Sequence, residues 1–157
     1  MIYLSVGTFH KGFDRLVKPL DNFCRINKIK CIAQIGGGDY LPKYMKYSRQ
    51  FSFSKHLLNI KKSNLVISHG GYGTIMDLIS LNKKFIVFPR NRNEAAHDQK
   101  MSIKYLKKKM KITACYSQKN LENRIMKFIL KKDIKIINLP KSNIPKIIKN
   151  FINLSSL

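Results

Sequence analysis

The chain has 157 residues, 44% of them hydrophobic, which suits one globular domain with its own core and is too short for two full α/β domains. Its 31 basic and 8 acidic side chains give a net charge of +23, and this excess alone does not name a function. It has two explanations, namely attraction to a polyanion such as nucleic acid or an anionic membrane face, and a coding bias that favours Lys, Ile and Asn.

Short apolar runs alternate with amphipathic stretches along the chain, the pattern typical of an α/β domain with a parallel sheet. Strands are expected at 2–6, 30–35, 65–68 and 84–88, with an edge strand near 51–53 and a short strand at 112–115. Helices are expected at 13–26, 56–63, 74–81, 97–109, 121–130 and 144–152. Because no repeat, linker or change of composition interrupts this order, we expect a single domain over 1–157.

The termini and the cysteines indicate the compartment. No hydrophobic run reaches the roughly 18 residues that span a bilayer, and the first residues lack the features of a cleaved signal, so they are expected to form a buried strand. The odd number of cysteines, without a CxxC pair, indicates reduced thiols in the core of a cytosolic protein.

The strands predict where a ligand binds. The run Phe85–Phe88 is apolar throughout, which indicates a sheet covered by helices on both faces. In such sheets ligands bind beyond the carboxyl ends of the strands. Three glycine-containing segments follow expected strands, namely Gly7-Thr8, Gly36–Gly38 and His69–Gly71, and they are expected to converge at that edge.

The segment Ser68–Thr74 links an expected strand directly to an expected helix. Its glycines allow the backbone to approach a ligand closely, and the start of a helix presents free N–H groups with a partial positive charge, which suits a diphosphate. The spacing matches neither a Walker loop nor the GxGxxG dinucleotide fingerprint. The alternative is a tight connection that needs glycine only for its turns.

Two polar side chains near this loop also have two interpretations. Asp77 has the reach for the two hydroxyls of a ribose, but Thr74 and Asp77 also have the spacing of a capping box, and the residues by themselves favour the cap. His69 at a strand end is more often a structural residue than a catalyst. It takes part in no metal-ligand spacing, and no acidic DxD-like motif is present, so no metal site is predicted.

Several of these segments, in the same order, resemble the C-terminal domain of family 28 glycosyltransferases. The similarity rests on Val66–Thr74 with Asp77, on Lys84–Arg90 and on Asp98-Gln99, and it extends to Val6–Thr8 with Phe13–Leu16 and to Gln34–Gly36. It is strongest to small stand-alone subunits, either of the PssE/EpsE type or like the soluble subunit of the two-piece lipid-linked GlcNAc transferase. It covers roughly residues 1 to 115, and the tail from Tyr116 carries no diagnostic motif.

The resemblance implies a Rossmann-like parallel sheet that forms the C-terminal, donor half of a GT-B fold. It implies an inverting transfer from a UDP-sugar to a lipid-linked saccharide, with no further cofactor, and a separate membrane-anchored subunit that binds the acceptor and holds this chain at the inner face of an anionic membrane. The donor-binding positions that it implies are Gly7, Thr8, His69, Gly70, Gly71, Gly73, Thr74, Asp77, Arg90, Asp98 and Gln99.

The catalytic base is not identified by these residues. His10, in the first loop, is a weak candidate for a contact on the acceptor side, and Arg90 with Arg92 would offset phosphate charge as UDP leaves. The chain departs from relatives in two places: Asp77 stands where Glu is usual, and a common His-Gln pair is replaced by His97-Asp98-Gln99.

Two other functions compete with this interpretation. A nucleic-acid-binding module would account for the net charge, but it needs exposed aromatic side chains among the basic ones, whereas Tyr3, Phe23, Phe85 and Phe88 stand in apolar runs and are expected in the core. We therefore expect no specific nucleic-acid partner. A regulatory or scaffolding subunit that kept the fold and lost donor binding is the second alternative.

Overall fold

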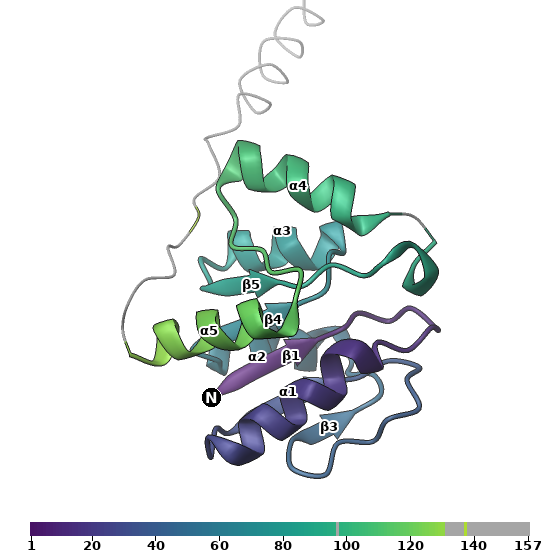
Figure 1. Ribbon diagram of the computed structural model, residues 1–157, viewed down its shortest axis with the longest axis vertical. Helices are drawn as coiled ribbons and strands as arrows, with labels where there is room; N and C mark the ends of the chain where they lie inside the picture. Colours follow the sequence, from purple (N-terminus) through teal and green to yellow (C-terminus); the bar gives the residue numbers. More distant parts are fainter. Residues whose placement is uncertain (97, 131–136, 138–157) are drawn as a thin grey trace, which may run out of the picture.

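The computed structural model describes residues 1–96, 98–130 and 137 and shows an α/β sandwich (Figure 1). Five parallel strands form one sheet in the order β3-β2-β1-β4-β5. The strands are β1 (Ile2–Ser5), β2 (Cys31–Gln34), β3 (Lys46–Ser48), β4 (Leu65–Ser68) and β5 (Phe85–Val87). The helices are α1 (Asp14–Ile26), α2 (Phe53–Lys62), α3 (Tyr72–Ser80), α4 (Gln99–Met110), α5 (Gln118–Ile129) and the short 3₁₀ helix η1 (Arg92–Glu94). The predicted fold class is confirmed.

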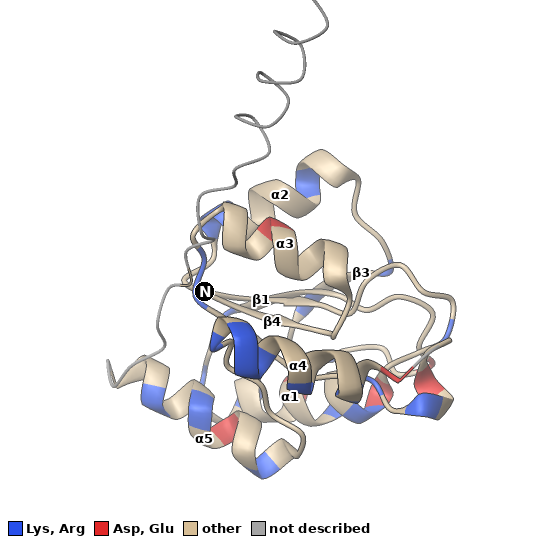
Figure 2. Cartoon of the chain, turned by 90° about the horizontal axis from the view of Figure 1, so that it is seen from above, with Lys and Arg blue, Asp and Glu red and all other residues tan. Residues whose placement is uncertain are grey.

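The sheet is buried on both faces because successive side chains of its central strands enter different cores. In β1, Leu4 packs with α1 and α5 in one core, and Tyr3 packs with α2, α3 and α4 in the other. Figure 2 shows the strands between α1 and α5 on one side and α2 and α3 on the other. Such strands must be apolar on both faces, which explains their continuous hydrophobic runs.

The aromatic residues assigned to the core from sequence are there. Tyr3, Phe23, Phe85 and Phe88 are all buried. The cysteines are free and buried, as expected for small core residues; they are Cys24, Cys31 and Cys115. These four aromatic side chains are therefore not available for base stacking, whereas Tyr47, Tyr72 and Tyr105 are exposed.

The sequence prediction was wrong about the edge strand at 51–53. Ser52 is instead the N-cap of α2, where its hydroxyl accepts a hydrogen bond from the amide of Lys55, and Phe53 is the first helical residue. The edge of the sheet is formed by β3, and residues 49–52 connect it to α2. Two phenylalanines on either side of a serine are compatible with an edge strand or with the start of a helix. The N-cap hydrogen bond of Ser52 shows that a helix starts here.

The first turn of α3 also differs from the prediction. The helix begins at Tyr72, two residues before the predicted start, and its N-cap residue is Gly71. Thr74 therefore lies inside the first turn and does not cap the helix, so the capping-box interpretation of Thr74 and Asp77 is wrong. The segment 112–115 contributes an isolated bridge between Ala114 and Val87 in place of a full strand.

Parts of the sequence prediction fall outside the described residues, namely the helix at 144–152 and His97, the expected first residue of α4. None of the described helices is long and apolar enough to cross a membrane. Lys and Arg lie along several helices, including α4 and α5 (Figure 2).

Candidate functional site

The cleft lies where the strand order of the sheet reverses. Strands β2 and β3 lie on one side of β1, and β4 and β5 lie on the other. The loops that follow β1 and β4 at their carboxyl ends line a cleft of about 390 Å³. It is lined by Ser5, Gly7, Thr8, Gln34, Gln50, Phe51, Phe53, His56, His69, Gly71, Gly73, Thr74 and Asp77.

The first loop enters the cleft at Gly7, whose φ of +78° is a conformation that favours glycine. The buried amide side chain of Gln34 holds this loop, because its nitrogen donates to the carbonyl of Gly7 at 3.0 Å. The oxygen of the same side chain accepts from the amide of Phe51, also at 3.0 Å. Gln34 thus fixes two opposite margins of the cleft, with Thr8 exposed beside them.

The imidazole of His69 fills the space that two glycines leave open. A Cβ atom at Gly7 would lie 2.7 Å from Cε1 and Nε2 of His69, and one at Gly71 would collide with Nε2. Burial, together with the charge of Arg90, lowers the pKa of His69 to about 4. His69 is therefore neutral at physiological pH and shapes the floor of the cleft.

The N-terminus of α3 opens into the cleft beside these glycines. Gly71 has no side chain to cap the helix, and the first intrahelical bond runs from the amide of Ile75 to the carbonyl of Gly71. The amides of Tyr72, Gly73 and Thr74 precede that bond, so within the described structure they lack an intrahelical partner. Amides in this position, at the positive end of a helix dipole, bind anions.

Gly73 differs from the other glycines of the cleft because it has no structural requirement for glycine. It is helical, and a Cβ atom there would meet no described atom within 4 Å. Gly7 and Gly71 make room for His69, whereas Gly73 leaves only the cleft itself unobstructed. A tight turn alone does not require glycine at this position.

The charged group of the cleft is the carboxylate of Asp77, on the second turn of α3. Opposite it lies His56 of α2, whose Nδ1 is 2.8 Å from the hydroxyl of Tyr3. Burial lowers the pKa of His56, and the charge of Asp77 acts in the other direction. No Lys or Arg is among the described residues that line the cleft, so the helix terminus is its source of positive potential.

Four of the predicted donor-binding residues are not among the residues that line the cleft, namely Gly70, Arg90, Asp98 and Gln99. Gly70 is buried, and its amide donates to Oε1 of Gln99 at 3.0 Å. Asp98 caps α4 by accepting from the amide of Lys100. Arg90 is buried, and all its hydrogen bonds in the described structure go to backbone carbonyls. The expected contact of Arg90 with phosphate is not compatible with this geometry.

The two remaining candidates lie at the surface. His10 is exposed in the first loop, with its ring 4.3 Å from that of Phe9, and it does not line the cleft. Arg92 is exposed in η1. Neither residue is among those that line the cleft.

Sequence reasoning missed one margin of the cleft, the connection from β3 to α2. Its residues Gln50, Phe51 and Phe53, with His56, face the glycine loop across the opening. They carry no motif, and the misplaced edge strand concealed the helix start. The sequence also predicted Ser5, at the end of β1, only as part of a strand and not as a residue that lines the cleft. The signal that could have found this margin was Ser52 as an N-cap.

Within the described residues, no three His, Cys, Asp or Glu side chains are grouped so that they could hold a metal ion.

The comparisons with known proteins agree on one kind of protein. The sequence profile of the glycosyltransferase family 28 C-terminal domain matches residues 1–152. The chain is 32% identical over 105 residues to the UDP-N-acetylglucosamine transferase subunit ALG13 of Saccharomyces cerevisiae, and this match covers 62% of the chain and 52% of the yeast protein. The chain thus spans about half the length of that relative.

Among solved structures, the glycotransferase of kitacinnamycin is similar with a TM-score of 0.54 at 14% identity, over 80% of this chain and 34% of that one. The glycosyltransferase SnogD from Streptomyces nogalater has a TM-score of 0.49 at 18% identity, over 66% and 29% of the two chains. The first similarity supports the fold, and each covers about a third of the larger chain.

Proposed function

Because the chain belongs to the family of glycosyltransferase family 28 C-terminal domains, we propose that it is the donor-binding subunit of a two-component glycosyltransferase that uses a UDP-sugar. The observation that carries this proposal is the cleft at the strand-order reversal, where the open N-terminus of α3 and the carboxylate of Asp77 face the same space. A nucleoside diphosphate has an anionic centre and a ribose with two hydroxyls, which matches this pair of features.

In the proposed complex the diphosphate lies against the first turn of α3. Amides of Gly73 and Thr74 donate to its oxygens, and the absence of a side chain at Gly73 permits the close approach. Asp77 accepts hydrogen bonds from the ribose, one turn further along the helix. Since no described Lys or Arg lines the cleft, binding depends on backbone amides.

The proposed reaction is an inverting transfer in which the bond from the anomeric carbon to the diphosphate breaks as the acceptor oxygen attacks. Negative charge grows on the departing diphosphate, and the N-terminus of α3 stabilises it there. The acceptor hydroxyl must lose a proton to a base. His69 is a poor base, since its pKa is about 4, and we assign the base to the partner subunit.

The proposed partner is a membrane-anchored subunit that binds a lipid-linked saccharide. The relative in Saccharomyces cerevisiae is itself named a subunit of a transferase, which supports a two-component enzyme. The chain would then work at the inner face of the membrane, where a net charge of +23 is attracted by anionic lipids.

Calorimetric titration with UDP tests the donor site, and 2′-deoxy-UDP tests the role of Asp77. We expect Asp77→Asn to weaken UDP binding about tenfold, the loss of a hydrogen bond to a charged group. The variant should bind UDP and 2′-deoxy-UDP with similar affinity, whereas the natural chain should prefer UDP. Glu122→Gln, at a half-buried position of α5, removes the same charge outside the cleft and is the matched control.

If UDP binds but the deoxy compound binds equally well to the natural chain, the ribose role of Asp77 is wrong. Absence of any UDP binding, alone and with the partner, would favour the scaffolding alternative. Sugar transfer is measured with UDP-GlcNAc and lipid-linked acceptor; we expect turnover only when chain and partner are mixed, and robust transfer by the chain alone would contradict the two-component proposal.

A further inference from the structure

Arg90 is a large polar side chain in an unusual place. It comes from the loop between β5 and α4, it is fully buried, and its guanidinium lies 4.5 Å from the centre of the Phe13 ring. Burying a charge is costly, and replacing a buried ionic group with an apolar one of similar size often stabilises a protein. A contribution to stability therefore does not explain well why an arginine is buried here. A role in positioning the neighbouring loops explains it better.

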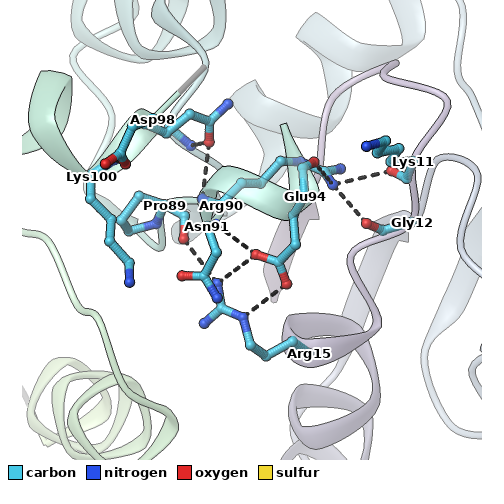
Figure 3. Close-up of polar contacts among 11 residues, drawn as sticks. Lys11, Gly12, Arg15, Pro89, Arg90, Asn91, Glu94, Asp98 and Lys100 are labelled. Atoms are coloured by element: carbon cyan, nitrogen blue, oxygen red, sulfur yellow. Dashed lines mark hydrogen bonds and ion pairs between the residues drawn. The ribbon is translucent and has the colours of Figure 1, made fainter. Parts of the chain in front are cut away.

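The guanidinium of Arg90 is bound to the first loop of the cleft. Its Nη1 donates to the carbonyls of Lys11 at 3.1 Å and Gly12 at 2.7 Å, and its Nη2 donates to the carbonyl of Val6 at 3.1 Å. Figure 3 shows the side chain of Arg90 extending from its own loop towards Lys11 and Gly12. These carbonyls flank Gly7 and Thr8 on both sides, so Arg90 fixes both ends of the segment that lines the cleft.

The backbone of Arg90 is in turn bound to the glycine loop. Oε1 of Gln99 accepts from the amide of Arg90 and from the amide of Gly70, each at 3.0 Å. Gln99 is buried, and a Cβ atom at Gly70 would lie 3.0 Å from its Oε1, so the loop and the side chain are in close contact. Arg90 and Gln99 therefore form a continuous connection from Val6–Gly12 to Gly70.

A half-buried ion pair supports this connection from outside. Arg15 of α1 donates to both carboxylate oxygens of Glu94 at 2.9 Å and to the carbonyl of Pro89 at 3.1 Å (Figure 3). The carbonyl of Glu94 accepts from Nη1 of Arg90 at 3.1 Å. The segment that carries Arg90 is thus held against α1, which follows the first loop of the cleft.

We propose that Arg90 and Gln99 are positioning residues that set the distance between the Gly7-Thr8 loop and the Gly70–Gly73 loop, and thereby the width of the donor cleft. This inference rests on the proposed function for its ligand, a UDP-sugar. For Arg90 it differs from direct donor recognition, because both terminal nitrogens already have backbone partners; for Gln99 it assigns the positioning role to Oε1, which accepts from two backbone amides. Positioning residues of this kind affect the whole ligand and not one of its groups.

The variants separate positioning from direct contact. Arg90→Met removes all its side-chain hydrogen bonds and keeps only the apolar stem of the side chain, and Arg90→Lys keeps the charge with fewer donors in reach. Gln99→Met removes the acceptor, whereas Gln99→Glu restores an oxygen for the two amides. We expect Arg90→Met and Gln99→Met to weaken UDP and UDP-GlcNAc equally, by about tenfold, as the loss of supporting groups does at other sites. Gln99→Glu should recover most of the affinity and Arg90→Lys part of it.

Hydrogen exchange measured by mass spectrometry supplies a readout that does not need the ligand. We expect faster exchange in segments 6–13 and 69–74 of Arg90→Met and Gln99→Met, with unchanged exchange in β1 and β4. Leu121→Ala, on the buried face of α5, is the control for reduced stability and should leave both segments and UDP affinity unchanged. Arg25→Met, on the exposed end of α1, is the control for one lost positive charge.

Three results would overturn the inference. The first is unchanged hydrogen exchange in both segments of Arg90→Met and Gln99→Met. The second is a Gln99→Met variant that loses affinity for UDP-GlcNAc but not for UDP, because this result would assign Gln99 to recognition of the sugar. The third is a loss of affinity by Leu121→Ala equal to that of Arg90→Met. If Arg90→Met does not fold, Arg90→Lys and Gln99→Met carry the test. If the natural chain binds no UDP, the proposed function fails, and the exchange data still decide whether the two loops are held together.

Discussion

Replacing Gly73 with alanine tests whether the glycine loop serves a ligand or only the chain. Glycine inside a helix costs up to about 1 kcal/mol relative to alanine, and a Cβ atom at Gly73 would meet no described atom within 4 Å. Gly73→Ala should therefore stabilise the unliganded protein by up to about 1 kcal/mol, a rise of about 2 °C in melting temperature for a chain of this size.

The same methyl group would project into the cleft at the first turn of α3. If the diphosphate lies against this turn, the methyl group displaces it and weakens hydrogen bonds from charged oxygens, each worth about 1.5–3 kcal/mol. UDP affinity should then fall by about tenfold or more. Thermal melts and calorimetric titration measure the two effects on the same samples. A variant that melts higher and binds UDP as well as the natural chain would refute the diphosphate position.

Other substitutions separate structure from binding in different ways. Gly71→Ala should lower both the stability and the UDP affinity of the protein, because the added Cβ collides with the ring of His69. Circular dichroism melts measure the stability and calorimetric titration measures the affinity. A gain in stability like that of Gly73→Ala would contradict the geometry. Because burial lowers the pKa of His69 to about 4, the unfolded chain binds the proton more tightly, so stability falls as pH drops from about 6.5 to 4, by about 3 kcal/mol. Urea denaturation at several pH values should show this loss, and His69→Asn should flatten it; an equally steep profile in the variant would exclude His69 as its cause. Burial acts to raise the pKa of Asp21, but hydrogen bonds from the amide of Met45 and other groups outweigh it and lower the pKa. Asp21→Asn should cost about 1–3 kcal/mol in urea without changing UDP affinity, and a change in affinity would argue against a purely structural role.

The site residues that sequence identified are those whose backbone makes the site. Gly7, Gly71 and Gly73 follow or begin elements with strong hydrophobic periodicity, so their place at the carboxyl edge of a parallel sheet follows from local pattern and topology. Asp77 follows from the same helix, because a position on α3 fixes its distance from the glycine loop. The resemblance to a family added the proposed ligand, which physical reasoning about the loop alone left open.

The roles of Arg90 and Gln99 were decided by tertiary structure. Both are polar side chains after a strand, and the sequence gives no means of telling whether such a group points into a cleft or behind it. Arg90 turns inward because its guanidinium donates to the backbone carbonyls of Val6, Lys11 and Gly12, which are contacts between residues more than 70 positions apart. The margin formed by Phe51 to His56 likewise enters the cleft only because β3 closes the sheet beside β2.

For this protein, then, amphipathic periodicity and glycine placement determined the strands, the helices and the glycine loop that lines the cleft, because these depend on residues close together in the chain. Hydrogen bonds between loops distant in sequence determined which side chains line the cleft and which support its loops from outside it. Such bonds form only after the sheet has brought the loops together, and that is why only the tertiary structure decided them.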